Sequence, residues 1–268
     1  MSKSSEGVHI VDYGSGPEIW VGLHGWNGTA RTFDTIAPYI PENVTFLSVD
    51  LPGYGRSEAP PVWDISEIGA QIDRAIVERI GEQSYSMIGS CGGAIVGLYV
   101  ARAAGERLDD FVCLEPFAFL PWYLRIFMWP VLGWLFYWSS FGTPIGRAIT
   151  NQAMTKHRND ETDMLASFGQ GSLMIPYRYL QLFNTIEASY LFKELPGHKI
   201  LVSGEHTFGA IRESVKEWNE VWPTADHIEI PGAGHLVLLE APELFAEKLF
   251  ERRAAKTPRL LPSHEQAS

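Results

Sequence analysis

The chain has 268 residues, of which 46% are apolar, so it can bury a sizeable core within one domain. Its 21 Lys and Arg residues against 32 Asp and Glu residues give a net charge of −11, and no basic run occurs, which argues against a nucleic-acid partner. The only two cysteines, Cys91 and Cys113, exclude a disulfide scaffold and a cysteine-based zinc cluster.

Short apolar runs alternate with amphipathic segments along most of the chain. Strands are predicted at residues 18–23, 44–49, 84–88, 110–114, 199–203 and 227–230. Helices are predicted at residues 30–40, 65–80, 93–105, 211–221 and 242–254. The helix at 65–80 has the strongest pattern, because isoleucine recurs every three or four residues behind Asp64, a suitable N-cap. This order predicts an α/β fold with a mainly parallel sheet and helices on both faces.

The alternation breaks between residues 116 and 190. We therefore predict an inserted helical cap at 116–190 and a core domain built from residues 1–115 and 191–268. In open sheets of this class, ligands bind beyond the carboxyl ends of the strands. The chemistry is accordingly expected in the residues that directly follow each strand.

Cys91 follows the predicted strand at 84–88 within the sequence Gly-Ser-Cys-Gly-Gly, which leads into a helix. A strand–turn–helix of this kind holds a nucleophile in a tight, strained turn that tolerates only small neighbours, and Gly89 and Gly92 meet that need. The start of a helix also favours a thiolate. Cys91 is therefore the candidate nucleophile, and the alternative is a buried cysteine in a glycine-rich turn.

From about Gly16 to Ala254 the chain resembles the α/β-hydrolase superfamily. The resemblance rests on four motifs in order: the cysteine-centred elbow, the His-Gly-Trp at 24–26, the Asp-Leu-Pro-Gly-Tyr-Gly-Arg-Ser at 50–57 and the Gly-Ala-Gly-His at 232–235. It implies an α/β-hydrolase fold, a catalytic triad and a cap inserted before one of the later strands. His235 is the expected general base, and His24 is interpreted as a structural residue of the oxyanion loop.

The third triad member departs from the commonest pattern of this superfamily. After the predicted strand at 199–203, Thr207 stands where an aspartate would be expected. A second family location, at the end of the strand after the elbow helix, holds Glu115 in this chain, and we predict that Glu115 orients His235. Glu205, or a Cys–His dyad without an acid, remains the alternative.

The predicted oxyanion hole consists of two backbone N–H groups, those of Trp26 and Gly92, which would stabilise a tetrahedral intermediate of acyl chemistry. The Trp26 side chain either lines the pocket or only packs beside it.

The predicted cap is rich in aromatic residues, with 11 of them between Phe117 and Phe141 and Arg125 as the only charge. Such a segment must be buried, bind an apolar ligand or touch a membrane surface. We predict an apolar substrate pocket and leave open the cap's own core and docking at a lipid interface. The candidate pocket residues are Trp122, Phe127, Trp129 and Trp134.

These residues together predict a hydrolase of an ester or thioester with an apolar, aromatic or long-chain acyl group, acting through an acyl-Cys91 intermediate. The alternatives are an acyltransferase or cyclase that uses the same triad, and a ligand-binding protein without catalysis. No metal or other cofactor is expected, because no matching motif occurs.

The start of the chain has no apolar stretch typical of a signal peptide, so we expect a cytoplasmic protein. The longest uncharged apolar stretch, residues 126–138, is too short to span a bilayer. Residues 257–268 are expected to form a frayed tail. The sequence gives no indication of the oligomeric state.

Overall fold

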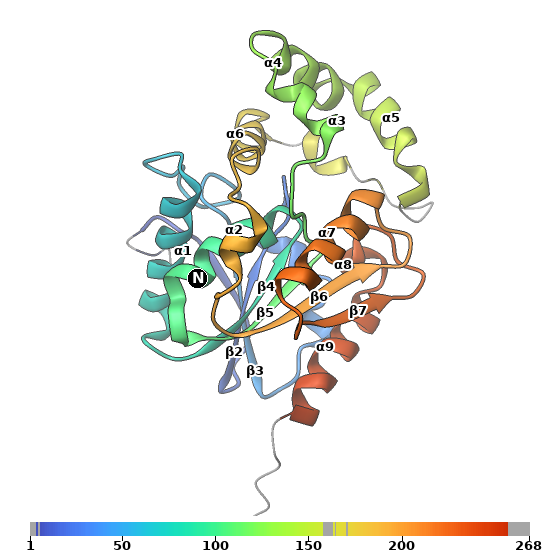
Figure 1. The fold of residues 1–268 in the computed structure, drawn as a ribbon. Coiled ribbons are helices and arrows are strands. Elements are labelled where there is room, and N and C mark those ends of the chain that lie inside the picture. The colour runs from blue at the N-terminus through green and yellow to red at the C-terminus, as the bar shows by residue number, and fades with distance from the viewer. Residues whose placement is uncertain (1–3, 5, 158–162, 164, 170, 257–268) are drawn as a thin grey trace, which may run out of the picture.

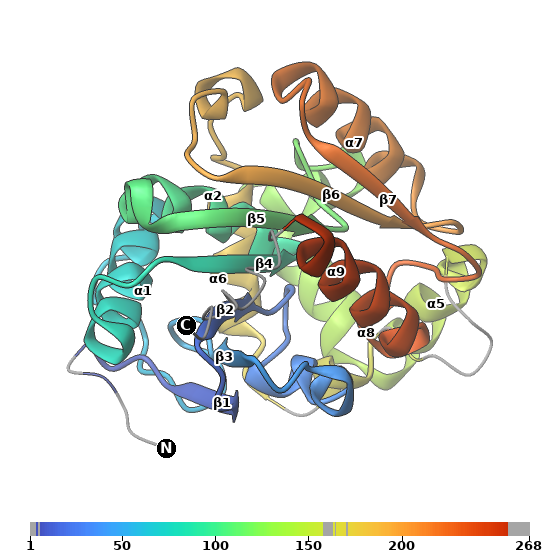
Figure 2. The same cartoon turned by 90° about the horizontal axis from the view of Figure 1, so that it is seen from below.

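The computed structural model describes residues 4, 6–157, 163, 165–169 and 171–256, so the expected tail at 257–268 lies outside the described residues. Seven strands form one sheet in the order β1-β3-β2-β4-β5-β6-β7 (Figures 1 and 2). β1 pairs antiparallel with β3, and all the other neighbours are parallel. The prediction of a mainly parallel sheet is confirmed.

All six predicted strands are present, and each boundary differs from the prediction by at most two residues. They are β2 (Glu18–Leu23), β3 (Val44–Val49), β4 (Tyr85–Ser90), β5 (Leu108–Leu114), β6 (His198–Gly204) and β7 (Asp226–Ile230). The sequence analysis misses β1 (Ile10–Gly14), a short edge strand. Its five residues, Ile-Val-Asp-Tyr-Gly, alternate in burial but not between apolar and polar side chains, so the sequence pattern does not indicate a strand.

Helices cover both faces of the sheet. The core helices are α1 (Ile65–Ile80), α2 (Gly92–Ala104), α7 (Gly209–Val221), α8 (Val237–Glu240) and α9 (Pro242–Lys256). Buried side chains of α1, α2 and α7 form one apolar cluster with one face, and those of α9 form a second cluster with the other face. Successive side chains of a strand point to opposite faces of the sheet, so a strand that is buried on both sides contributes to both clusters. In β5, Phe111 and Cys113 belong to the first cluster, and Val112 and Leu114 belong to the second.

The helix predicted from isoleucine periodicity begins where its cap residue indicates. The Asp64 carboxylate accepts hydrogen bonds from the backbone N–H groups of Ser66 (2.9 Å) and Glu67 (3.0 Å). The four isoleucines from Ile65 to Ile76 face the sheet and are buried. Here, local capping and the hydrophobic pattern specify the same element.

The helix predicted at residues 30–40 is wrong. The segment forms two short 3₁₀ turns, Ala30–Phe33 and Ala37–Tyr39. The Ser48 hydroxyl donates to the carbonyl of Ala30 (2.7 Å), and Pro38 has no N–H with which to continue a helix. The apolar periodicity reflects burial of Phe33 and Ile36 in the core, which the turns achieve without a helix.

The chain between β5 and β6 leaves the sheet and forms a separate layer beyond the carboxyl ends of the strands (Figure 1). Its helices are α3 (Trp122–Arg125), α4 (Leu132–Tyr137), α5 (Pro144–Ala153) and α6 (Met174–Phe183). We call residues 116–197 the β5–β6 insertion; its status as a separate cap domain stays a prediction. Among the described residues, no helix is long and apolar enough to cross a membrane.

Candidate active site

Cys91 occupies the sharp turn between β4 and α2. Its backbone has φ 50° and ψ −112°, a left-handed conformation that a non-glycine residue rarely adopts. A Cβ atom on Gly89 would lie 2.5 Å from the Cα of Ala94, and one on Gly93 would lie 2.3 Å from the carbonyl oxygen of Leu23. Gly89 is therefore small for the reason predicted, and Gly93, two residues after Cys91, is a further position that must be small and that the prediction did not name. At the predicted Gly92, a Cβ atom would lie 2.8 Å from the ring of Phe183.

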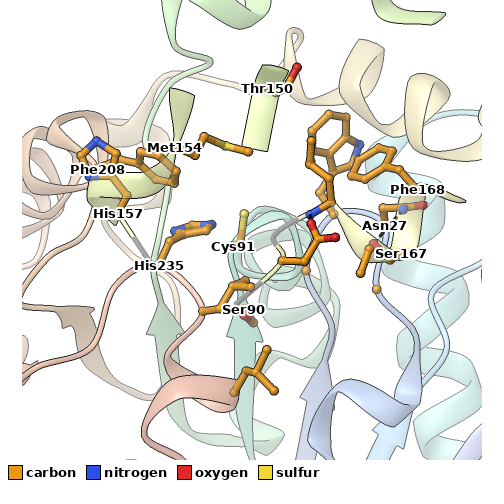
Figure 3. A pocket seen from close by; sticks show the side chains of 18 of the residues that line it. Asn27, Ser90, Cys91, Thr150, Met154, His157, Ser167, Phe168, Phe208 and His235 are labelled. Atoms are coloured by element: carbon orange, nitrogen blue, oxygen red, sulfur yellow. Dashed lines mark hydrogen bonds between the residues drawn. The ribbon is translucent and has the colours of Figure 1, made fainter. Parts of the chain in front are cut away.

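Neighbouring strands hold this turn in place. The backbone N–H of Cys91 donates to the carbonyl of Leu114 at the end of β5 (2.8 Å). Ser90 is the last residue of β4, so the cysteine and not the serine has the strained turn conformation. The Cys91 side chain is partly exposed and lines a cavity (Figure 3).

His235 and Glu115 meet beside Cys91. Nδ1 of His235 lies 2.7 Å from Oε2 of Glu115, and the ring also hydrogen-bonds with Cys91. Because Nδ1 faces the carboxylate, Nε2 is the nitrogen available to the cysteine sulfur. Figure 3 shows the ring of His235 pointing toward Cys91. The structure thus brings the three predicted triad residues together.

Glu115 is held by more partners than the sequence indicates. It directly follows β5, has φ 54° and is only 1% exposed. Oε1 accepts a hydrogen bond from the backbone N–H of Gly204 (2.6 Å), and Oε2 also accepts one from the hydroxyl of Thr207. These donors stabilise a carboxylate that burial would otherwise make costly.

Thr207 is the residue whose role the sequence analysis misses. It stands at the site where an acid was expected, and the structure shows it buried and bonded to the acid on the adjacent strand. The sequence did contain an indication of this role, because one of the two possible acid locations holds Thr207 and the other holds Glu115.

Glu205, the alternative acid, lies elsewhere. Its side chain is exposed and accepts a hydrogen bond from the backbone N–H of Gly232 (2.8 Å). It therefore braces the loop that carries His235, while Glu115 contacts the imidazole directly.

The electrostatics of the site favour a protonated imidazole. Burial alone would lower the pKa of His235, but the adjacent Cys91 sulfur and the Glu115 carboxylate together raise it to about 10. A positive imidazolium beside the sulfur is the arrangement that stabilises a thiolate. The charge pattern suits nucleophilic attack by Cys91.

The residues that carry the two predicted oxyanion amides lie beside Cys91. A Cβ atom placed on Gly92 would lie 3.2 Å from the backbone nitrogen of Trp26, so the two predicted oxyanion residues are neighbours. Neither N–H donates a hydrogen bond to another residue in the part of the chain that the structure describes. Both amides are therefore available to an oxyanion.

His24 fixes the loop that carries Trp26. Its Nδ1 lies 2.8 Å from the carbonyl of Gly25, and its Nε2 accepts from the backbone N–H of Leu51 (3.0 Å). Complete burial lowers the pKa of His24 to about 4, so the ring is neutral and can keep both bonds. This geometry agrees with the structural role expected for His24.

A cavity of about 930 Å³ opens beside Cys91 and His235, between the sheet edge and the insertion. Most of its lining is apolar, as Phe168, Phe208 and Met154 illustrate (Figure 3). The indole of Trp26 packs against Phe141 and Phe168, with ring centroids 5.4 and 5.1 Å apart, and its Nε1 donates to the carbonyl of Pro176 (2.7 Å). Trp26 therefore both lines the cavity and anchors the insertion.

The structure places one of the four predicted pocket residues at the cavity. Phe127 lines the cavity, but Trp122, Trp129 and Trp134 are not among the described residues that line it. Trp122 and Trp129 are 82% and 56% exposed, and Trp134 packs on Tyr137 and Tyr177. Aromatic content identifies the segment, but only the packing of its short helices decides which rings point inward.

His157 is a second residue that the sequence analysis misses. It lines the cavity, its ring lies 4.5 Å from that of Phe208, and its carbonyl accepts the backbone N–H of His235 (3.0 Å). The insertion thus directly supports the loop of the candidate base. In the described residues, no group of three His, Cys, Asp or Glu side chains gathers as a metal site requires.

Comparisons with known proteins agree with this architecture. A "Serine hydrolase-like protein" of Danio rerio is 33% identical over 103 residues, which are 37% of this chain and 31% of that protein. A "Pimeloyl-[acyl-carrier protein] methyl ester esterase" of Klebsiella pneumoniae is 25% identical over 85% of this chain and 90% of its own length. The chain spans about a third of the Danio rerio protein.

Solved structures show the same fold. An esterase from Exiguobacterium antarcticum superposes with a TM-score of 0.77, 14% sequence identity and coverage of 93% of this chain and 97% of its own. A sequence model described as "Alpha/beta hydrolase family" matches residues 20–248. That match covers most of the chain, from within β2 into α9, and it includes the whole β5–β6 insertion. The chain therefore belongs to the alpha/beta hydrolase family.

Proposed function

We propose that this protein is an ester or thioester hydrolase that uses Cys91 as nucleophile, His235 as acid–base and Glu115 as the orienting carboxylate. The observation that carries the proposal is the Glu115–His235–Cys91 array at the wall of a large apolar cavity. Relatives named as esterases and serine hydrolases support ester hydrolysis. In this chain, a cysteine stands in the elbow.

The reaction follows from the positions of these groups. The Cys91 thiolate attacks the substrate carbonyl, and the resulting oxyanion accepts hydrogen bonds from the N–H groups of Trp26 and Gly92. The His235 imidazolium then gives its proton to the leaving alkoxide or thiolate, which departs as the C–O or C–S bond breaks. Neutral His235 next removes a proton from water, and the hydroxide attacks the acyl-Cys91 thioester. The C–S bond to Cys91 then breaks, the acid product leaves, and the Cys91 thiolate and the His235 imidazolium are regenerated.

The cavity supports an apolar acyl group as the part of the substrate that is bound. Its lining presents mainly aromatic and aliphatic side chains, with few polar groups such as Asn27 and Ser167, which hydrogen-bond each other (3.0 Å). In this proposal, residues 1–115 and 191–268 supply the catalytic core, and the cap at 116–190 supplies one wall of the pocket.

Intact-mass spectrometry after exposure to a panel of aryl esters and acyl thioesters tests the mechanism. We expect a mass increase equal to one acyl group, lost in Cys91→Ala and retained in Cys113→Ala, the matched control. The size of the adduct identifies the acyl group. A substrate that turns over without any adduct, and equally well with Cys91→Ala, would contradict the proposal.

The same experiment separates transfer from hydrolysis. Amine or alcohol acceptors are added to the acylated enzyme. If water is the natural acceptor, the only product should still be the free acid. A new amide or ester product would assign the protein to the acyltransferases or cyclases while leaving the triad intact. Ligand binding without any turnover, unaffected by Cys91→Ala, would identify a non-catalytic binding protein.

A further inference from the structure

The helices α3, α4 and α5 display large apolar side chains on the outside of the protein. Ten of the sixteen exposed large apolar side chains of the described residues lie between Trp122 and Ile149. Soluble surfaces normally carry such residues singly, and a concentration of them marks an interaction site. We call this group the outer apolar face: Trp122, Tyr123, Ile126, Trp129, Val131, Leu132, Leu135, Trp138, Ile145 and Ile149.

Val131 combines an exposed apolar side chain with an unfavourable backbone conformation. Val131 is 94% exposed and has φ 65°, a conformation that a β-branched residue strongly disfavours. Glycine or asparagine would relieve that strain and would be more polar as well. An apolar side chain at this position has no visible role within the chain itself, which points to a partner outside it.

The charges around the outer apolar face differ from those of the whole protein. Residues 116–157 contain the cations Arg125, Arg147 and Lys156 and no Asp or Glu, whereas the whole chain has a net charge of −11. Acidic residues return only at 160, 161 and 163, after α5. An apolar, tryptophan-rich surface with cations and no carboxylates matches the interface of an anionic bilayer.

The position of these helices suits contact with a surface. They form the outermost layer of the molecule, on the side away from α9 (Figure 1). On α5, Ile145 and Ile149 lie on one helical stripe with Ala153, which lines the cavity. Tyr123 likewise belongs to both the outer apolar face and the cavity wall. The apolar surface therefore continues into the cavity.

We infer that α3–α5 form a docking surface for an anionic lipid bilayer, with the tryptophans at the headgroup level and the cations at the lipid phosphates. Trp side chains favour this interface because their rings are apolar and their N–H groups can hydrogen-bond. Every acidic residue of the chain lies outside residues 116–157, and salt largely screens charges that are more than about 10 Å from the bilayer. This inference concerns a surface outside the catalytic array and does not depend on the proposed reaction.

Vesicle co-sedimentation of the full chain tests the inference. We expect binding to phosphatidylcholine vesicles containing about 30% phosphatidylserine, and weaker binding to phosphatidylcholine alone. The triple variant Val131→Asn, Leu135→Gln, Ile145→Gln should bind about tenfold less, because it removes apolar contacts without changing charge. The matched control is Val62→Asn, Tyr190→Gln, Leu191→Gln, which alters exposed apolar residues elsewhere and should bind like the original protein.

A charge variant separates the two contributions. Arg125→Gln with Lys156→Gln should lower binding to the anionic vesicles and leave binding to phosphatidylcholine unchanged. Circular dichroism and the melting temperature establish that each variant is folded. The inference is overturned if the original protein binds neither kind of vesicle. It is also overturned if the triple variant and the original protein bind the anionic vesicles equally well. A concentration-dependent dimer that the triple variant abolishes, without vesicle binding, would instead assign the face to a second copy of the chain.

Discussion

The carboxyl edge of the sheet buries polar groups, whereas the helices α3–α5 expose apolar ones. At the sheet edge, polar atoms are buried and paired, as shown by Glu115 with donors from Gly204, Thr207 and His235. In α3–α5, large apolar side chains such as Trp122 and Ile145 are exposed, at 82% and 74%. Each region departs from the ordinary rule of burial, and each departure has a physical consequence.

At the sheet edge, the consequence is a fixed geometry. A buried carboxylate with several donors can adopt few orientations, so it holds the imidazole precisely. In α3–α5 the short helices and strained Val131 leave an apolar surface that the chain itself does not cover. Under the proposed function, the bond-making steps belong to the core, and the insertion contributes to the choice of substrate.

Loss of the orienting carboxylate should have the largest effect. Glu115→Gln removes the negative charge beside Nδ1 of His235 and should lower kcat by about 10³-fold, as expected when a triad acid loses its charge. Glu205→Gln is the control, because the Glu205 carboxylate accepts a hydrogen bond from the backbone of the histidine loop and does not contact His235 in the described structure, and we expect less than about a threefold change. Steady-state kinetics with an active ester measure both. The reverse ranking would move the acid to Glu205.

Loss of the Thr207 hydroxyl should have a smaller effect of the same kind. Thr207→Val keeps the shape of the buried side chain but removes a donor to Glu115, so kcat should fall about tenfold with little change in KM. Thr207→Ser restores the hydroxyl and should restore most of the rate. If Val and Ser variants lose activity equally, the residue contributes packing rather than positioning.

Changes in the insertion should alter substrate choice rather than chemistry. Phe168→Ala enlarges the apolar cavity and should lower kcat/KM about fivefold for a long or aromatic acyl ester, the order expected for one or two lost methylene contacts. The effect on an acetyl ester should be smaller. Phe136→Ala deletes the same ring in the same insertion at a residue that does not line the cavity, and should leave the ratio unchanged.

The smallest expected effect is on the pH dependence of stability. The pKa of His235 is raised to about 10 in the folded protein, above its ordinary value of 6.5, so its contribution to stability is present in full below pH 6.5. That contribution is lost as the pH rises through about 10. Cys91→Ala removes the sulfur that raises this pKa and should flatten the decline in unfolding free energy across that range. Urea titrations at several pH values provide the measurement.

The sequence predicted most of the fold because local and global signals agree. At α1, the Asp64 cap and the isoleucine period specify the same helix. Residues 30–40 show where this fails, since Phe33 and Ile36 have helical spacing but the bond from Ser48 and the missing N–H of Pro38 favour 3₁₀ turns. β1 was missed because its five residues, Ile-Val-Asp-Tyr-Gly, do not alternate between apolar and polar side chains.

The sequence by itself determined the family resemblance, six of the seven strands and the candidates Cys91, His235 and Glu115, because each candidate follows a predicted strand. Only the tertiary structure decided that Glu115 rather than Glu205 contacts His235, and that Thr207 donates to it. Only packing decided that Phe127 lines the cavity while Trp122 faces outward. Spacing along a chain identifies the ends of strands, but which side chains meet depends on how separate strands and short helices pack in three dimensions.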